Sequence, residues 1–315
     1  LYGGAIWNAT LSLYAHANLQ VLDKPTLIFE AIDQKERVTV ERQNVLPIEG
    51  PLTLLKGVYN RIQAQYGLSA TGLHLTTFVD APAGSGLGTS STLVVAIVGA
   101  FAEYLRLPLG EYDIAQLAYD IERKDLGMAG GKQDQYAATF GGVNFMEFLS
   151  VDRVIVNPLR IKQHYLFELE NNLLLYYTST SRESAKIIEK QSANVVQKKE
   201  KSLEAMHQLK LQAQQMKEVL LKGKLNEIGE ILDFGFQQKR QMAEGISNPL
   251  IDEIYDTAKK AGATGGKISG AGGGGFMTFY CPGNSKYSVM AALERFGGYT
   301  KPYQFVDHGL TSWTI

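Results

Sequence analysis

The stretch PAGSGLGTSS, residues 82–91, places three glycines at alternate positions and follows them with three consecutive hydroxyl side chains. Glycines let the backbone come close to an anion and turn several N–H groups toward it. The apolar run at 93–102 reads as a buried helix, and a helix that begins here adds a dipole favourable to negative charge. The stretch therefore predicts a phosphate-binding loop, with a plain glycine-rich turn before a buried helix as the alternative.

Two better-known nucleotide loops do not fit this stretch. A Walker loop ends in Gly-Lys-Ser/Thr, and no lysine occurs between residues 82 and 102. The dinucleotide pattern G-x-G-x-x-G occurs at 270–275, but the run that follows, 276–280, reads as a strand where that pattern requires a helix. A flexible glycine hinge is the simpler interpretation of 270–275, and a dinucleotide-dependent oxidoreductase is kept only as an alternative.

The composition is that of an ordinary globular protein. The chain has 315 residues, 45% of them hydrophobic, which predicts about two domains. Its 31 basic and 32 acidic residues leave a net charge of −1, and its longest apolar run is too short to span a membrane. We therefore expect a small-molecule partner, no nucleic acid and no membrane, while the oligomeric state stays unknown. The single cysteine, Cys281, excludes an internal disulfide and favours a cytoplasmic location and a buried thiol.

The periodicity of apolar residues predicts two parts of mixed structure. Before the glycine loop we expect a helix at 51–65 and strands at 9–17, 26–31, 37–41 and 73–79. After it we expect helices at 111–124 and throughout 182–262, with strands at 141–148, 173–178 and 276–280. The pattern changes near 158–164, which predicts two α+β domains, 1–160 and 161–315.

Two acidic residues after the loop have the character of functional groups. Glu122 lies at the apolar edge of the expected helix 111–124, where a carboxylate could point inward and bind Mg²⁺; a solvated side chain is the alternative. Asp134 follows two glycines and Lys132. Phosphoryl transfer needs a carboxylate that orients the attacking hydroxyl and cations that offset the charge of the transferred group. Asp134 and Lys132 are the candidates, and a carboxylate that caps the next helix is the other interpretation of Asp134.

Three motifs in this order resemble those of the GHMP kinases, which are the galactokinase, homoserine, mevalonate and phosphomevalonate kinases. They are PxGxGLGTSS at 82–91, GGKQDQ at 130–135 and KISGAGGGG at 267–275. The run GGKQDQYAA, with GGVNF behind it, looks most like the D-glycero-D-manno-heptose phosphate kinases of this superfamily. The resemblance implies an N-terminal domain like ribosomal protein S5 domain 2 and a C-terminal ferredoxin-like domain, with the active site between them.

The resemblance also implies ATP and Mg²⁺ and assigns roles to residues. Asp134 becomes the catalytic carboxylate, and Ser90 and Glu122 become the magnesium ligands. The implied phosphate loop comprises Pro82, Gly84, Ser85, Gly86, Leu87, Gly88, Thr89, Ser90 and Ser91. The expected substrate and closing-loop residues are Gln133, Arg182, Gly270, Ala271, Gly272 and Gly273. Arg182 is included because arginine matches phosphate oxygens in a bidentate way, with a surface salt bridge as the alternative.

The reaction implied is phosphorylation of the anomeric hydroxyl of D-glycero-D-manno-heptose 7-phosphate, for nucleotide-activated heptose and surface polysaccharide. A kinase of another sugar such as fucose or galactose, and a non-catalytic sensor of sugar phosphate or nucleotide, are the alternatives. The family's first motif, a strand with a basic residue and a Gly-Thr-Asp turn, is absent before Leu1. We therefore expect the true N-terminus and some substrate-binding groups to lie outside this chain.

Overall fold

Residues 3–149, 153–180, 184–197 and 200–315 are described by the computed structural model, and their contacts divide the chain into two compact units. The N-terminal unit consists of Ser12–Pro82, Gly88–Gly141 and Val306–Ile315. The C-terminal unit consists of Leu1–Leu11, Ala83–Leu87 and Gly142–Phe305. Each unit thus combines separate stretches of the sequence. The expected division into domains at residue 160 stays a prediction.

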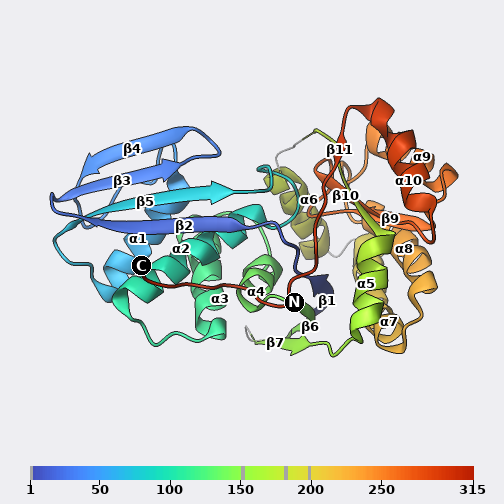
Figure 1. Ribbon diagram of the computed structural model, residues 1–315, viewed down its shortest axis with the longest axis horizontal. Coiled ribbons are helices and arrows are strands. Elements are labelled where there is room, and N and C mark those ends of the chain that lie inside the picture. Colours follow the sequence, from blue (N-terminus) through green and yellow to red (C-terminus); the bar gives the residue numbers. More distant parts are fainter. Residues whose placement is uncertain (1–2, 150–152, 181–183, 198–199) are drawn as a thin grey trace. The chain divides into compact units, whose positions relative to one another are not determined.

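A four-stranded sheet in the order β2-β5-β3-β4 forms one layer of the N-terminal unit, and helices cover one of its faces (Figure 1). The β3–β5 pair is parallel, and the other two pairs are antiparallel. The strands are β2 (Ala15–Leu22), β3 (Thr26–Ala31), β4 (Glu36–Glu41) and β5 (Gly72–Val79). The helices are α1 (Thr53–Tyr66), α2 (Thr89–Leu105), α3 (Glu111–Asp120) and α4 (Gln133–Phe140), and a π-helical turn, Ile121–Asp125, continues α3.

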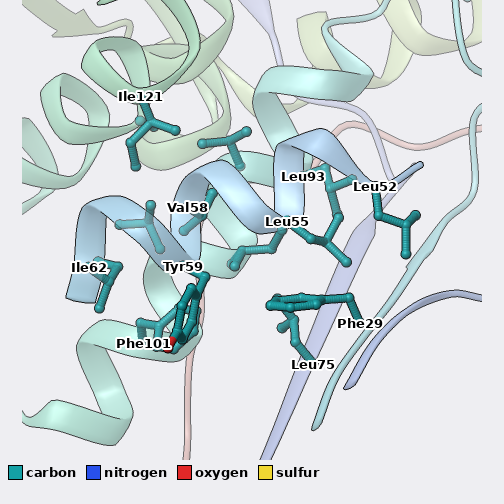
Figure 2. Packing of buried hydrophobic residues seen from close by; sticks show 14 of the residues in the cluster. Phe29, Leu52, Leu55, Val58, Tyr59, Ile62, Leu75, Leu93, Phe101 and Ile121 are labelled. Carbon is teal, nitrogen blue, oxygen red and sulfur yellow. The ribbon is translucent and has the colours of Figure 1, made fainter. Parts of the chain in front are cut away.

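Apolar periodicity explains how these two layers pack. Alternate residues of β3 are fully buried, so one face of the strand meets the helices. Phe29 on that face packs edge to face against Tyr59 of α1, with ring centroids 5.9 Å apart. Figure 2 shows Tyr59 next to Phe101 of α2, with Leu75 of β5 beneath Phe29. The core of this unit therefore lies between the sheet and the first two helices.

The last segment of the chain, Val306–Ile315, returns to the N-terminal unit. The N–H of Leu310 donates to the carbonyl of Thr139 in α4 at 3.1 Å. The side chain of Leu310 packs on Gly99 of α2, where an added methyl group would lie 2.6 Å from it. This segment therefore completes the packing of the helical layer.

The C-terminal unit contains two sheets and six helices within the described ranges. One sheet has the order β1-β6-β7 and the other β11-β8-β10-β9, and all of their pairs are antiparallel. The strands are β1 (Gly4–Ala9), β6 (Val143–Phe148), β7 (Val154–Pro158), β8 (Leu173–Tyr177), β9 (Gly265–Ile268), β10 (Phe276–Tyr280) and β11 (Tyr299–Thr300). The helices are α5 (Gln163–Asn172), α6 (Ser184–Val196), α7 (Glu200–Lys222), α8 (Ile228–Arg240), α9 (Pro249–Lys260) and α10 (Ser285–Leu293).

The α+β class predicted from the sequence is confirmed. The strands expected at 26–31 and 276–280 are β3 and β10, and the helical block expected at 182–262 contains α6 to α9. The strand expected at 9–17 is wrong. The chain ends β1 at Ala9, changes unit after Leu11 and begins β2 at Ala15, so one alternating stretch contributes to two different sheets. No helix in the described part of the chain has both the length and the apolar character needed to cross a membrane.

Cys281 is fully buried, as predicted, and burial raises the pKa of its thiol to about 12. Because the thiolate is the reactive form, the native protein at pH 8 should react with a disulfide reagent about 10³-fold more slowly than an ordinary thiol of pKa 9.0. Thiol titration before and after addition of denaturant measures this, with one equivalent released only on unfolding. Rapid, full labelling of the native protein would contradict the buried position.

Candidate active site

The glycine loop adopts a backbone that its three alternate glycines make possible. Gly84, Gly86 and Gly88 have φ values of 73°, 79° and 73°, in the left-handed region that favours glycine. Gly88 is the N-cap residue of α2 and has no side chain that could accept from the first-turn N–H groups. The start of α2 therefore offers N–H donors and the positive end of the helix dipole to an anion.

The first part of this loop, Ala83–Leu87, belongs to the C-terminal unit and packs there against the loop between β9 and β10. A methyl group at Gly86 would lie 2.8 Å from the carbonyl oxygen of Ser269, and one at Gly270 would lie 2.6 Å from the Cα of Gly86. The N–H of Phe276, at the start of β10, donates to the carbonyl of Ser85 at 2.8 Å. Two glycine-rich motifs that lie far apart in the sequence therefore meet backbone to backbone.

Hydrogen bonds connect the closing-loop residues to the rest of the C-terminal unit. Lys239 of α8 donates to the carbonyl of Gly270, and Gln191 of α6 donates to that of Ala271 at 3.4 Å. The N–H of Gly273 donates to the carbonyl of Ile246 at 2.8 Å. This loop leads into β10 and not into a helix, so the dinucleotide-binding alternative finds no support.

The second part of the glycine loop belongs to the N-terminal unit, where it lies against Asp134. A methyl group at Gly88 would be 3.0 Å from both Cβ and Cγ of Asp134. Asp134 is in the first turn of α4, where the helix dipole favours a negative charge, and Gln133 donates to its Oδ1 at 3.3 Å. A carboxylate is thus held beside the N-terminus of α2.

Ser90 and Glu122, the predicted magnesium ligands, are directly bonded. The hydroxyl of Ser90 donates to Oε1 of Glu122 at 2.6 Å, and the Glu122 side chain is fully buried. Glu122 lies in the π-helical turn, a rare feature that often marks functional sites. The next residue, Arg123, is also directed inward: its side chain is 11% exposed and its Nη2 lies 3.8 Å from Oε2 of Glu122. A hydroxyl and a carboxylate oxygen therefore converge at the start of α2.

Sequence reasoning missed one member of this cluster. Gln135 is fully buried, and its Nε2 donates to Oε2 of Glu122 and, at 3.0 Å, to Oγ of Ser91. Its position gives no periodicity signal, because a buried amide on a short helix looks like a surface residue in the sequence. The signal that the sequence does contain is the place of Gln135 at the end of the GGKQDQ motif, directly after Asp134.

Two further residues were predicted to belong to the site, Lys132 and Arg182. The ammonium group of Lys132 lies 4.5 Å from the centre of the Tyr119 ring and 3.4 Å from Oε1 of Gln116, so residues of α3 help to hold it. Arg182 lies outside the described residues.

Comparisons with known proteins show which family this chain resembles. Residues 53–142 match the GHMP kinases N terminal domain and residues 216–297 match GHMP kinases C terminal. The chain is 46% identical over 314 residues to the D-glycero-alpha-D-manno-heptose 7-phosphate kinase of Campylobacter jejuni, covering 100% of this chain and 92% of that protein. It is 27% identical over 301 residues to the L-fucokinase/L-fucose-1-P guanylyltransferase of Bacteroides fragilis, covering 87% of this chain and 31% of that protein.

Solved structures are also similar to this chain over its full length. The crystal structure of a D-glycero-D-manno-heptose 1-phosphate kinase from Bacteroides thetaiotaomicron superimposes with a TM-score of 0.84 at 43% identity, covering 100% of this chain and 92% of that one. The two matched domains and the full-length similarity lead to one conclusion: this chain belongs to the GHMP kinase family.

Proposed function

We propose that this protein is an ATP-dependent kinase that phosphorylates the anomeric hydroxyl of D-glycero-D-manno-heptose 7-phosphate, for nucleotide-activated heptose and surface polysaccharide. The observation that carries the proposal is the contact of Gly88 with Asp134, which sets a carboxylate beside the loop and helix terminus suited to phosphate. The similarity to the Campylobacter jejuni heptose 7-phosphate kinase supports the choice of acceptor. ATP and a reduced, buried Cys281 both suit a cytoplasmic location, which we propose as well.

In the proposed mechanism, backbone N–H groups of the loop and of the start of α2 hold the nucleotide phosphates. Asp134 orients the acceptor hydroxyl and takes its proton as the oxygen attacks the γ-phosphorus. The bond from that phosphorus to the bridging oxygen breaks, and ADP leaves. Lys132 offsets the negative charge of the transferred group, and Gln133, Arg182 and the closing loop, Gly270, Ala271, Gly272 and Gly273, contact the substrates.

The donor set at Ser90 and Glu122 fits Mg²⁺. Both would contribute oxygen ligands, which this hard cation prefers, and the two side chains meet at the start of α2. Within the described ranges, no three His, Cys, Asp or Glu side chains are grouped to hold a metal by themselves. That agrees with the usual manner of Mg²⁺ binding, in which one or two protein ligands are completed by phosphate oxygens and water. When bound, the ion neutralises charge on the phosphates.

The acceptor is tested by ADP release together with phosphorus NMR of the product. Heptose 7-phosphate should give a bisphosphate with a new phosphorus signal coupled to the anomeric proton, while heptose 1-phosphate, fucose and galactose should react slowly or not at all. Turnover of fucose or galactose alone would reassign the acceptor. If the protein binds nucleotide but releases no ADP with any of these sugars, the result would instead indicate a sensor.

Asp134→Asn should lower kcat by roughly 10²–10⁴-fold, because the amide cannot accept the hydroxyl proton. Asp23→Asn, in the exposed connection between β2 and β3, is the matched control and should retain wild-type turnover. Steady-state kinetics at saturating substrates measure both. A wild-type kcat for Asp134→Asn would remove Asp134 from the mechanism.

Ser90→Ala and Glu122→Gln should each raise the Mg²⁺ concentration needed for half-maximal activity by about tenfold or more, since each alters one oxygen ligand. A magnesium titration at fixed ATP provides the measurement. Because Glu122 is buried, thermal unfolding of each variant should be recorded alongside. Unchanged titrations in two folded variants would refute the assignment of these residues as ligands.

A further inference from the structure

The two oxygens of the Glu122 carboxylate have different surroundings. Oε1 accepts the hydroxyl proton of Ser90 at 2.6 Å and so lies on the side of the α2 N-terminus. Oε2 accepts from Nε2 of Gln135 and lies 3.8 Å from Nη2 of Arg123. One oxygen therefore faces Ser90, the other proposed metal ligand, and the second oxygen faces the nitrogen groups of Gln135 and Arg123.

From this asymmetry we propose that Gln135 confines Glu122 to coordination through Oε1 alone and thereby sets the preference of the site for Mg²⁺ over Ca²⁺. The proposal rests on the proposed function, because it takes Ser90 and Glu122 as the metal ligands. Gln135 is a positioning residue in this account: it acts through Glu122 and has no contact of its own with the reacting atoms.

Burial strengthens the hydrogen bond from Gln135 to Oε2 of Glu122. Gln135 and Glu122 are both fully buried and Ser91 is 2% exposed, so little bulk water competes for the hydrogen bond. The amide also has a defined direction, because Nε2 serves Oε2 and the Ser91 hydroxyl together. Turning the amide over would set its oxygen against a carboxylate oxygen, and two acceptors repel.

The consequence for metal choice follows from coordination chemistry. Mg²⁺ requires near-octahedral geometry and short ligand distances, and a carboxylate usually binds it through one oxygen. Ca²⁺ accepts six to eight ligands, and a carboxylate often binds it through both oxygens. Because Oε2 accepts the hydrogen bond from Gln135, Glu122 cannot offer a second oxygen to the metal. The affinity for Ca²⁺ is therefore reduced more than the affinity for Mg²⁺.

The test uses binding rather than turnover. The affinity of the full chain for a non-hydrolysable ATP analogue is measured by calorimetry with Mg²⁺, with Ca²⁺ and with EDTA. Gln135→Met keeps the volume and removes the donor, and Gln135→Asn keeps an amide that is too short to reach Oε2. In both variants the ratio of the Ca²⁺ to the Mg²⁺ dissociation constant should fall by about tenfold. Thr139→Val is the control. It removes the 2.8 Å hydrogen bond from the Thr139 hydroxyl to the backbone carbonyl of Gln135 and should leave the ratio unchanged.

Each outcome separates this proposal from the function on which it rests. If Gln135 is only structural, its variants will weaken binding with both metals equally, and an unchanged ratio overturns the proposal. If Ser90→Ala and Glu122→Gln leave the metal dependence intact, the metal assignment itself is wrong. A crystal structure of the wild-type protein with Ca²⁺ and the analogue does not depend on the variants: coordination through Oε1 alone is expected, and coordination through both oxygens contradicts the proposal.

Discussion

A fully buried carboxylate must have its hydrogen bonds satisfied inside the protein, and this constraint organises the N-terminal unit. Glu122 meets it with Ser90 on one oxygen and Gln135 on the other, which ties the start of α2, the π-helical turn and α4 to one point. Asp134 precedes Gln135 directly, so its place on α4 is set by the same bond. The cluster therefore fixes the spacing between two acidic groups for which we propose different roles.

The contact between Gly86 and Gly270 plays the matching part in the C-terminal unit. Two loops can approach this closely only if neither carries a side chain at the point of contact, since a methyl group on either would collide with backbone. The hydrogen bond from the N–H of Phe276 to the carbonyl of Ser85 then joins the glycine loop to the sheet through β10. The glycines at this contact are therefore required by packing, independently of the proposed anion binding.

The sequence allowed the α+β class and most of the elements to be predicted, because these depend on local periodicity and on short motifs. For Glu122 it left both an inward and a solvated side chain open. It did not allow Gln135 to be recognised as part of this cluster, since a polar residue that is buried among hydrogen-bond partners leaves no apolar pattern. The π-helical turn was equally hidden, because a regular helix was expected over the residues that include Glu122 and the partly buried Arg123. The wrong strand at 9–17 has another cause, because alternation reports a half-buried strand but not the sheet to which it belongs.

The return of Val306–Ile315 to the N-terminal unit means that the linear order of the chain is a poor guide to where it can be divided. The chain passes between the units five times, so no single cut yields two complete halves. A fragment that stopped at Phe305 would uncover Gly99 and leave the Thr139 carbonyl without the N–H of Leu310. The loss at the C-terminal end of the sequence would therefore destabilise the N-terminal unit. Fusion partners and fragment libraries that treat the extreme C-terminus as dispensable would therefore expose part of the helical layer of α2 and α4.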